Sequence, residues 1–160
     1  MSTFKKFAFA DGMKAPEVAT SIGAKFVEGA FATAPQAAGE ASETFRKLYE
    51  KRFKELPPKP YIDSAYDAAM LIGLATVKAK SSDPKAIRDA LRFVANPPGE
   101  QIKPGEFAKA KKRLEAGQDI DYVGAGGPQN FDAVGDVVGT YAHWEFKGGQ
   151  IVTIKVFEPK

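Results

Sequence analysis

The residues best suited to chemistry gather in one glycine- and aspartate-rich stretch, residues 121–136, which reads DYVGAGGPQNFDAVGD. A dinucleotide-binding loop needs the spacing GxGxxG between a strand and the start of a helix, so that backbone amides face the pyrophosphate. Residues 124–128 have the glycines without that spacing, and they precede an expected strand. We therefore predict no phosphate site in this stretch.

Calcium binding is the second chemistry to consider for the same stretch. An EF-hand loop needs alternating oxygen ligands and a distal glutamate between two helices. Asp132 and Asp136 offer two carboxylates four residues apart, but β-structure is expected to follow them. A turn closed by Asp132 and Gly135 is the simpler interpretation, because both residue types favour turns.

Catalytic chemistry lacks the necessary residues. The chain has no cysteine, which excludes disulfides, thiolate metal sites and cysteine nucleophiles. Its single histidine, His143, lies on an expected strand with only Glu145 as a neighbour on the same face. An enzyme such as a small α/β hydrolase or transferase needs a nucleophile and a base within reach. We predict no catalytic residue, no metal site, no cofactor and no enzymatic activity, and we take an exposed or half-buried strand histidine as the simpler explanation.

Composition and charge limit the partners. The 160 residues are 44% hydrophobic and 27% charged, with a net charge of +3, as in an ordinary globular domain. The basic cluster Lys109, Lys111, Lys112 and Arg113 shares its expected helix with glutamates, so we interpret it as a solvated helix face and predict no nucleic-acid partner. No apolar run reaches the roughly 18 residues of a membrane helix.

The chain opens with a pattern typical of a βαβ unit. Residues 4–10 predict a strand, residues 16–25 a helix with Pro16 in its first turn, and residues 27–33 a second strand. The middle is helical, and the helices are expected at 41–56 with Ser42 as N-cap, at 61–80 and largely buried, at 83–96 with Asp83 as N-cap, and at 105–116.

The tail is predicted to be a β-hairpin. Ala142, Trp144 and Phe146 alternate with polar neighbours over residues 140–146, which favours a half-buried strand. Gly148 and Gly149 are typical of a tight hairpin turn, and residues 151–157 form the returning strand. A further short strand is expected at 129–131. The fold class is therefore α/β, with a βαβ start, a helical middle and a C-terminal β-hairpin.

Four segments, in order, resemble one protein family. They are FAFADGMKAPEVATSIGAKFVEGAFATAP, FRKLYEKRFKELPPKPYIDSAYDAAMLIGLA, SSDPKAIRDALRFV and AGQDIDYVGAGGPQNFDAVGDVVGTYAHWEF. Their shared features include an Asp-Gly loop before a helix, an EGxxxTxP strand, an FxxxYxxxF helix, a buried AYDA helix and an acidic-aromatic-x-Gly-x-x-Gly segment. Together they resemble the type I periplasmic solute-binding proteins of branched-chain amino acid ABC transporters, the Leu/Ile/Val-binding family.

The resemblance implies that residues 1–160 match the C-terminal part of a two-lobed, periplasmic-binding-protein-like type I fold. Residues 1–36 and 118–160 would come from one lobe with its crossing strands, and residues 37–117 would supply helices of the other. The opening MST looks like an added start joined to the middle of a longer protein, and no signal-peptide pattern is visible.

Two positions carry over as ligand-binding residues. Asp11, in ADGM, matches the acidic residue that pairs with the ligand's ammonium group, and Tyr61, in PYIDSAYDA, matches an aromatic that lines the apolar side of the pocket. Each has a structural alternative. Asp11 could simply be a turn residue before Gly12, and Tyr61 could pack in the core or start a helix. Asp63 and Ser64 lie near Tyr61, and only one of them is expected to face the ligand.

The function implied by the resemblance is that of a substrate-binding component of an ABC transporter. It would bind a small ligand such as an amino acid or related carboxylate, with a permease as partner and a periplasmic or cell-surface lipoprotein location. The alternative is a stand-alone interaction or assembly module, formed by self-association of a chain that lacks half of its sheet.

Overall fold

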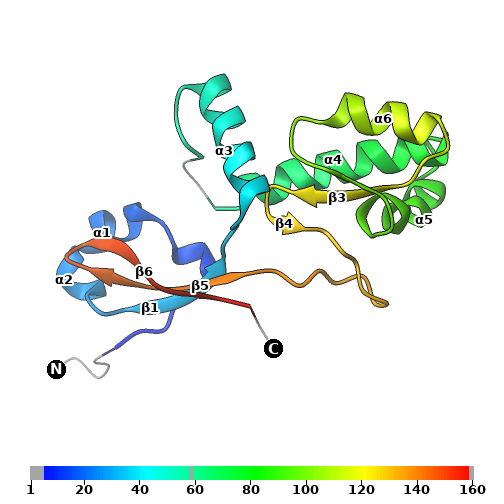
Figure 1. The fold of residues 1–160 in the computed structure, drawn as a ribbon. Helices are drawn as coiled ribbons and strands as arrows, with labels where there is room; N and C mark the ends of the chain where they lie inside the picture. Colours follow the sequence, from blue (N-terminus) through cyan, green and yellow to red (C-terminus); the bar gives the residue numbers. More distant parts are fainter. Residues whose placement is uncertain (1–5, 58–59, 159–160) are drawn as a thin grey trace. The chain divides into compact units, whose positions relative to one another are not determined.

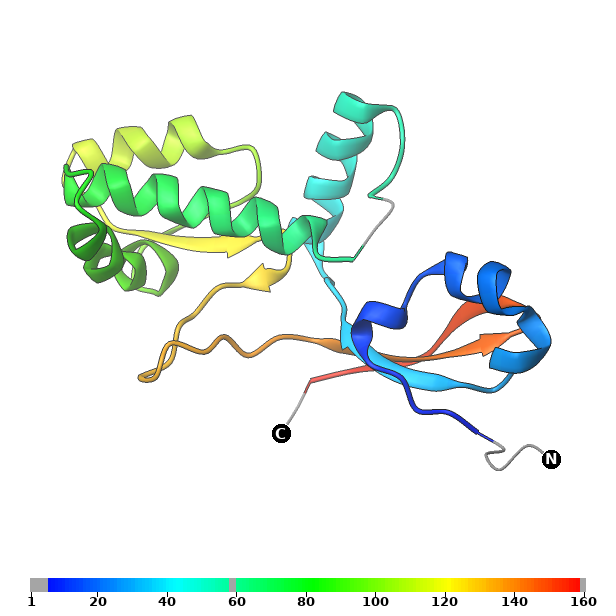
Figure 2. The same cartoon turned by 180° about the vertical axis from the view of Figure 1, so that it is seen from behind.

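A computed structural model describes residues 6–57 and 60–158. The chain forms two compact units, residues 1–36 with 140–160, and residues 37–139. Figures 1 and 2 show each unit from two sides. Among the described residues, no helix combines the length and apolarity needed to cross a membrane.

The first unit is a three-stranded antiparallel sheet with short helices on one face (Figure 1). Its strands are β1 (Phe31–Pro35), β5 (Tyr141–Lys147) and β6 (Gln150–Phe157), in the order β1-β5-β6. Its helices are the short 3₁₀ turn η1 (Asp11–Met13), α1 (Pro16–Ile22) and α2 (Ala24–Val27). The core contains Trp144 and Phe146, whose rings meet edge to face with centroids 5.5 Å apart.

The opening segment differs from the predicted βαβ unit. Residues 4 and 5 of the expected first strand lie outside the described residues. The described remainder forms one isolated parallel bridge, Ala8 to Phe31, with Phe9 N–H donating to the Phe31 carbonyl at 2.8 Å. The direction is parallel as expected, but a strand is not formed.

The expected helix at 16–25 is interrupted at Gly23. Its φ of 100° lies in the left-handed region, where glycine carries little strain. The chain therefore starts a second short helix, α2, and Val27 is buried at the end of that helix rather than in a strand. The second strand, expected at 27–33, consequently begins four residues later and ends two residues later, as β1.

The C-terminal hairpin is confirmed. Gly148 and Gly149 join β5 to β6 with φ values of 58° and 76°, the positive pair that a tight two-residue turn requires. The alternation in β5 is also as predicted. Ala142, Trp144 and Phe146 are fully or almost fully buried.

The second unit packs helices around a short sheet. The helices are α3 (Glu40–Phe53), α4 (Ile62–Ala79), α5 (Pro84–Ala95) and α6 (Phe107–Glu115). The strands are β2 (Glu100–Ile102), β3 (Ile120–Gly124) and β4 (Gly127–Pro128), with β2 parallel and β4 antiparallel to β3. The core contains Leu74 from α4, Val94 from α5 and Tyr122 from β3, none of them exposed.

Of the two predicted helix N-caps, one is confirmed and one is wrong. Asp83 caps α5 as predicted, because its carboxylate accepts from Ala86 N–H at 2.9 Å and Pro84 takes the first helical position. Ser42 does not cap α3. The helix starts earlier, after Gly39, and Ser42 lies buried inside it. The expected burial of α4 holds for most of its positions, with Leu74 and Ala75 fully buried, but one face is open and Ile72 on it is 54% exposed.

Residues 118–139 pack with the second unit, whereas we expected them to accompany residues 1–36. The reason is strand β3, which residues 118–128 were not expected to contain. It pairs with β2, and its inward side chains Ile120 and Tyr122 are fully buried in the helical core. The strand predicted at 129–131 is reduced to one bridge between Phe131 and Val137. The predicted turn follows it: the Asp132 carboxylate accepts from the N–H groups of residues 134–136 at 2.8–2.9 Å.

Gly124 should not tolerate a larger residue. A Cβ at this position would lie 2.4 Å from Oδ2 of Asp67. That carboxylate is buried and held by hydrogen bonds, so it cannot easily move away. We expect Gly124→Ala to lower the free energy of unfolding by about 1–3 kcal/mol, measured by urea denaturation. Gly139→Ala is the control, because nothing lies within 4 Å of its added Cβ. Equal stability of the two variants would contradict the close approach.

Candidate functional site

Asp11 lies at the end of the first unit's opening segment, as the first residue of η1. Its side chain is half-buried, and its Oδ1 accepts from Gly12 N–H at 2.7 Å. Because the preceding residues run parallel to β1, Asp11 follows the carboxyl end of a β-segment. That edge is where open α/β sheets bind ligands. Asp11 is therefore a turn residue before Gly12, as its structural alternative expected, and its role in ligand binding stays a prediction.

A second polar group shares this edge. Lys14 directly follows η1, and its Nζ donates to Oε1 of Gln36 at 3.2 Å. Gln36 follows the last residue of β1, and its N–H donates to the carbonyl of Thr140 at 2.9 Å. The hydroxyl of Thr140 donates in turn to the Gln36 carbonyl. Gln36 is therefore held by its backbone, and its side chain fixes the position of the Lys14 ammonium.

Tyr61 immediately precedes α4 in the second unit. It has a left-handed backbone with φ of 68°, its carbonyl accepts from Ala65 N–H at 2.9 Å, and its side chain is 40% exposed. It therefore starts the helix, as one structural alternative foresaw, while still presenting its ring. Of its neighbours, Asp63 accepts from Ser64 N–H at 2.9 Å, and Ser64 lines a cavity.

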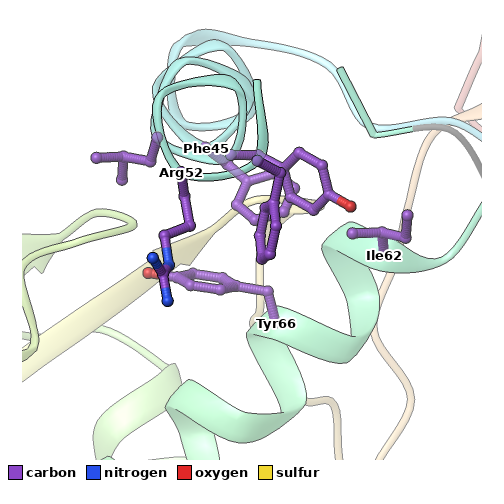
Figure 3. A pocket seen from close by; sticks show the side chains of 7 residues that line it. Phe45, Arg52, Ile62 and Tyr66 are labelled. Carbon is purple, nitrogen blue, oxygen red and sulfur yellow. The ribbon is translucent and has the colours of Figure 1, made fainter. Parts of the chain in front are cut away.

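An aromatic pocket of about 250 Å³ lies between α3 and the start of α4 (Figure 3). Phe45, Tyr49 and Phe53 recur every fourth residue along α3, so they share one helix face. Tyr66 of α4 meets them, with its ring centroid 4.9 Å from that of Phe45. Figure 3 shows the Arg52 side chain extending from α3 along this pocket. Its lining suits an apolar group and carries one cation.

A second cavity, of about 300 Å³, lies beside the buried Asp67. Ser64, Gln129 and the Asp67 carboxylate give it polar groups, and Leu71 and Leu91 are among its apolar ones. The sequence did not point to this cavity, because Gln129 and Phe131 come from a segment that was expected to belong elsewhere.

The glycine-rich turn 124–127 does bind an anion, but the anion is the protein's own carboxylate. Asp67 is 2% exposed and accepts four hydrogen bonds. Its Oδ1 accepts from the Tyr122 hydroxyl and Ala125 N–H, both at 2.7 Å. Its Oδ2 accepts from Gly126 N–H at 2.7 Å and from the Gln129 amide at 3.4 Å. The backbone amides of Ala125 and Gly126, which would face a phosphate in a nucleotide-binding loop, therefore already donate to Asp67.

Two opposing effects set the charge of Asp67. Burial raises the pKa of its carboxyl, while the hydrogen bonds from Gly126, Tyr122 and Ala125 lower that pKa in part. Burial raises the pKa of the Tyr122 hydroxyl, and the neighbouring Asp67 carboxylate raises it further. Tyr122 therefore stays protonated and remains a hydrogen-bond donor.

Groups for catalysis or metal binding are sparse in the described structure. His143 is half-buried on β5, where its ring meets Phe31 edge to face at 5.8 Å. Within residues 6–57 and 60–158, no cluster of three or more histidine, aspartate or glutamate side chains is arranged to hold a metal ion. The absence of enzymatic activity stays a prediction from the sequence.

Comparison with known proteins places this arrangement in context. No family model matches the chain. The substrate-binding protein BasB of a chemotactic signal transduction system in Halobacterium salinarum is 35% identical over 85 residues, which are 53% of this chain and 21% of that protein.

Two solved structures resemble the fold. A leucine-binding protein of Thermotoga maritima matches 96% of this chain at 23% identity, with a TM-score of 0.66, and 37% of that protein is covered. A branched-chain amino acid transporter substrate-binding protein of Streptococcus pneumoniae, solved with isoleucine, matches 99% of this chain at 17% identity, with a TM-score of 0.65 and 39% covered. The predicted likeness to the type I solute-binding fold is therefore confirmed, and the chain spans less than half the length of each relative.

Replacing Asp67 tests the buried network. In Asp67→Asn the new amide group faces N–H donors, and at least one buried donor loses its acceptor. We expect the free energy of unfolding to fall by about 3 kcal/mol, measured by urea denaturation. Asp89→Asn is the control, because Asp89 is an exposed partner of Arg88. A loss no larger than in the control would contradict the structural role of the network.

The same pair of proteins gives a pH test. Because the pKa of Asp67 is raised in the folded chain, the folded state holds more protons. The stability linked to this titration is complete below the unfolded pKa of about 4, and is lost as the pH rises through the folded pKa. The stability difference between wild type and Asp67→Asn should therefore shrink with rising pH, and a difference that grows would contradict the raised pKa.

Proposed function

We propose that this chain is part of a solute-binding protein that captures a small ligand, an amino acid or a related carboxylate, for an ABC transporter. The observation that carries the proposal is the match of at least 96% of the chain to the fold of two amino-acid-binding proteins. The curated relative at 35% identity is also named as a substrate-binding protein. A permease partner and a periplasmic or cell-surface location belong to the same proposal.

Asp11 is the residue that we propose for the ligand's ammonium group. A half-buried carboxylate is suited to a charge-assisted hydrogen bond with an ammonium group. Its position beyond a β-segment at the carboxyl edge of the unit supports this role. We propose that Tyr61 covers an apolar part of the ligand, since its ring remains partly exposed at the start of α4.

The BasB relative adds a second kind of partner. It is named for a chemotactic signal transduction system, so a membrane signalling receptor is a candidate partner alongside a permease. Both partners would recognise the ligand-bound form of the same binding protein.

Asp11→Asn should weaken ligand binding without weakening the fold. Asparagine retains an oxygen for the Gly12 turn but loses the charge. We expect affinity for amino acids to fall by about tenfold to a hundredfold. The measurement is the ligand-dependent rise in melting temperature, because binding to the native state stabilises it by mass action. Asp136→Asn, an exposed aspartate in the other unit, is the matched control.

Three outcomes of that experiment are informative. A rise in the wild type that is lost only in Asp11→Asn supports the proposal. A rise that persists in Asp11→Asn shows that another residue meets the ammonium group. If a panel of amino acids and small aromatic acids leaves the wild-type melting temperature unchanged, ligand capture by this chain is rejected.

Self-association is the alternative function, and strand β6 favours it. In the described sheet, β6 pairs with β5 on one side only. Three of its apolar side chains, Val152, Ile154 and Val156, are 36–50% exposed. An exposed apolar edge strand is a template for pairing with another chain. If the edge is used in this way, gel filtration should give a dimer that Ile154→Lys converts to monomer; a monomeric wild type would exclude the alternative.

A further inference from the structure

The aromatic pocket between α3 and α4 lies entirely within the second unit (Figure 3). All of its lining residues fall between positions 45 and 66, so it needs no residue of the first unit. Tyr66 meets Phe45 with ring centroids 4.9 Å apart. Along α3, Phe45 meets Tyr49 at 5.9 Å, and Tyr49 meets Phe53 at 4.5 Å. These separations match the range of about 4.5–7 Å for favourable ring pairs, so the four side chains form one continuous row of rings.

This row of rings is buried at one end and open at the other. Phe45 is 4% exposed, whereas Phe53, further along α3, is 57% exposed. Exposed apolar side chains that line one cavity are typical of an interaction site rather than of a core. The pocket volume of about 250 Å³ lies just below the range of about 300–1,000 Å³ that is usual for drug-sized ligands. The pocket therefore suits a small molecule with a single ring.

Two hydrogen-bond donors line the same pocket. The Arg52 guanidinium lies over the Phe53 ring, with 6.0 Å between its central carbon and the ring centroid, and makes no ion pair or hydrogen bond within the described part of the chain. The Tyr66 hydroxyl accepts from Gly105 N–H at 2.7 Å, and among residues 6–57 and 60–158 no group accepts its own proton. Figure 3 shows the nitrogen end of Arg52 and the hydroxyl end of Tyr66 on the same side of the pocket.

These donors and rings together select a chemical class. A guanidinium is a planar fork of N–H donors that matches the two oxygens of a carboxylate, and a hydroxyl proton strengthens the contact with an anion. No aspartate or glutamate is among the residues that line the pocket, so no side chain there competes for Arg52. The row of rings favours an aromatic group, because aromatic rings gain from offset and edge-to-face contacts beyond the area that they bury.

We propose that this pocket binds a small aromatic carboxylate, with its ring against Phe45, Tyr49 and Phe53 and its carboxylate on Arg52 and Tyr66. The inference goes beyond the proposed function, because neither Asp11 nor Tyr61 takes part and no ammonium group is required. A molecule bound in this way contacts α3 and α4 together, so it fixes the two helices against each other.

Benzoate is the probe for this pocket, titrated into the full chain and followed in ¹H–¹⁵N spectra. We expect it to shift signals of residues 45–66 to saturation. Arg52→Met should weaken binding by at least about tenfold, through loss of a charge-assisted hydrogen bond. Phe53→Ala, which removes an exposed ring, should weaken it as well. Arg46→Met is the matched control, because Arg46 is an exposed arginine of the same helix that does not line the pocket. Its affinity should equal that of wild type.

Two analogues separate the carboxylate from the ring. Benzamide keeps the ring without the charge and should bind at least about tenfold more weakly than benzoate. Cyclohexanecarboxylate keeps the charge without the aromatic ring and should also bind more weakly. Benzamide binding as tightly as benzoate overturns the role of Arg52, and cyclohexanecarboxylate binding as tightly overturns the aromatic assignment. Signals of residues 45–66 that do not move, or that move equally in Arg52→Met, overturn the inference as a whole.

Competition with an amino acid distinguishes this pocket from the proposed ligand site. Excess leucine should leave the benzoate shifts of residues 45–66 unchanged, and Asp11→Asn should bind benzoate like wild type. If leucine displaces benzoate, the two molecules share one site and a separate aromatic pocket is rejected. If benzoate fails to bind while leucine still raises the melting temperature, only this inference fails and the proposed function stands.

Discussion

The second unit depends on one buried carboxylate. Asp67 extends from α4 and collects donors from the end of β3, the turn after it and Gln129, so a single charged group joins the helical layer to the sheet. A buried charge is costly unless its hydrogen bonds are complete, and here both oxygens are satisfied. Gly124 and Gly126 follow from this constraint, because a side chain at Gly124 would occupy the space of the carboxylate.

That network also positions the groups around the neighbouring cavity. Gln129 donates to both Asp67 and the Gly127 carbonyl, and it lines the 300 Å³ cavity with Ser64. A little further along the chain, Asn96 on the end of α5 exchanges two hydrogen bonds with the backbone of Phe131. The segment that follows the glycines is therefore fixed by hydrogen bonds at Gln129 and at Phe131. Its β-structure is limited to the bridge between Phe131 and Val137.

A different constraint organises the first unit: the two places where the chain leaves it and re-enters it are hydrogen-bonded to each other. The chain leaves it after Gln36 and returns at Thr140, and the two residues are joined by a backbone and a hydroxyl hydrogen bond. Polar groups gather at this point because β1 ends there and the η1 turn lies against it. This edge thus brings two charged side chains, Asp11 and Lys14, next to backbone that is fixed by hydrogen bonds.

The sequence by itself determined the features whose signals are local. The N-cap of Asp83, the turn at Asp132, the glycine pair of the hairpin and the alternating strand before it each depend on a few adjacent residues, and each appears as predicted. The ordered set of weak motifs also identified the fold. Asp11 and Tyr61 were chosen from the same resemblance, and their roles in binding remain proposals.

Tertiary structure decided the features that depend on distant partners. Strand β3 was missed because glycines and aspartate weaken its local signal, whereas its pairing with β2 and the burial of Tyr122 come from contacts far along the chain. In the sequence, Asp67 is one polar residue in an apolar helix. Its role could not be predicted, because its hydrogen-bond donors lie more than fifty residues away along the chain. The sequence alone does not distinguish Lys14 from the other lysines of the chain. Only folding places it beside Gln36 with no carboxylate partner among the described residues, because burial and pairing are properties of neighbours that the sequence does not make adjacent.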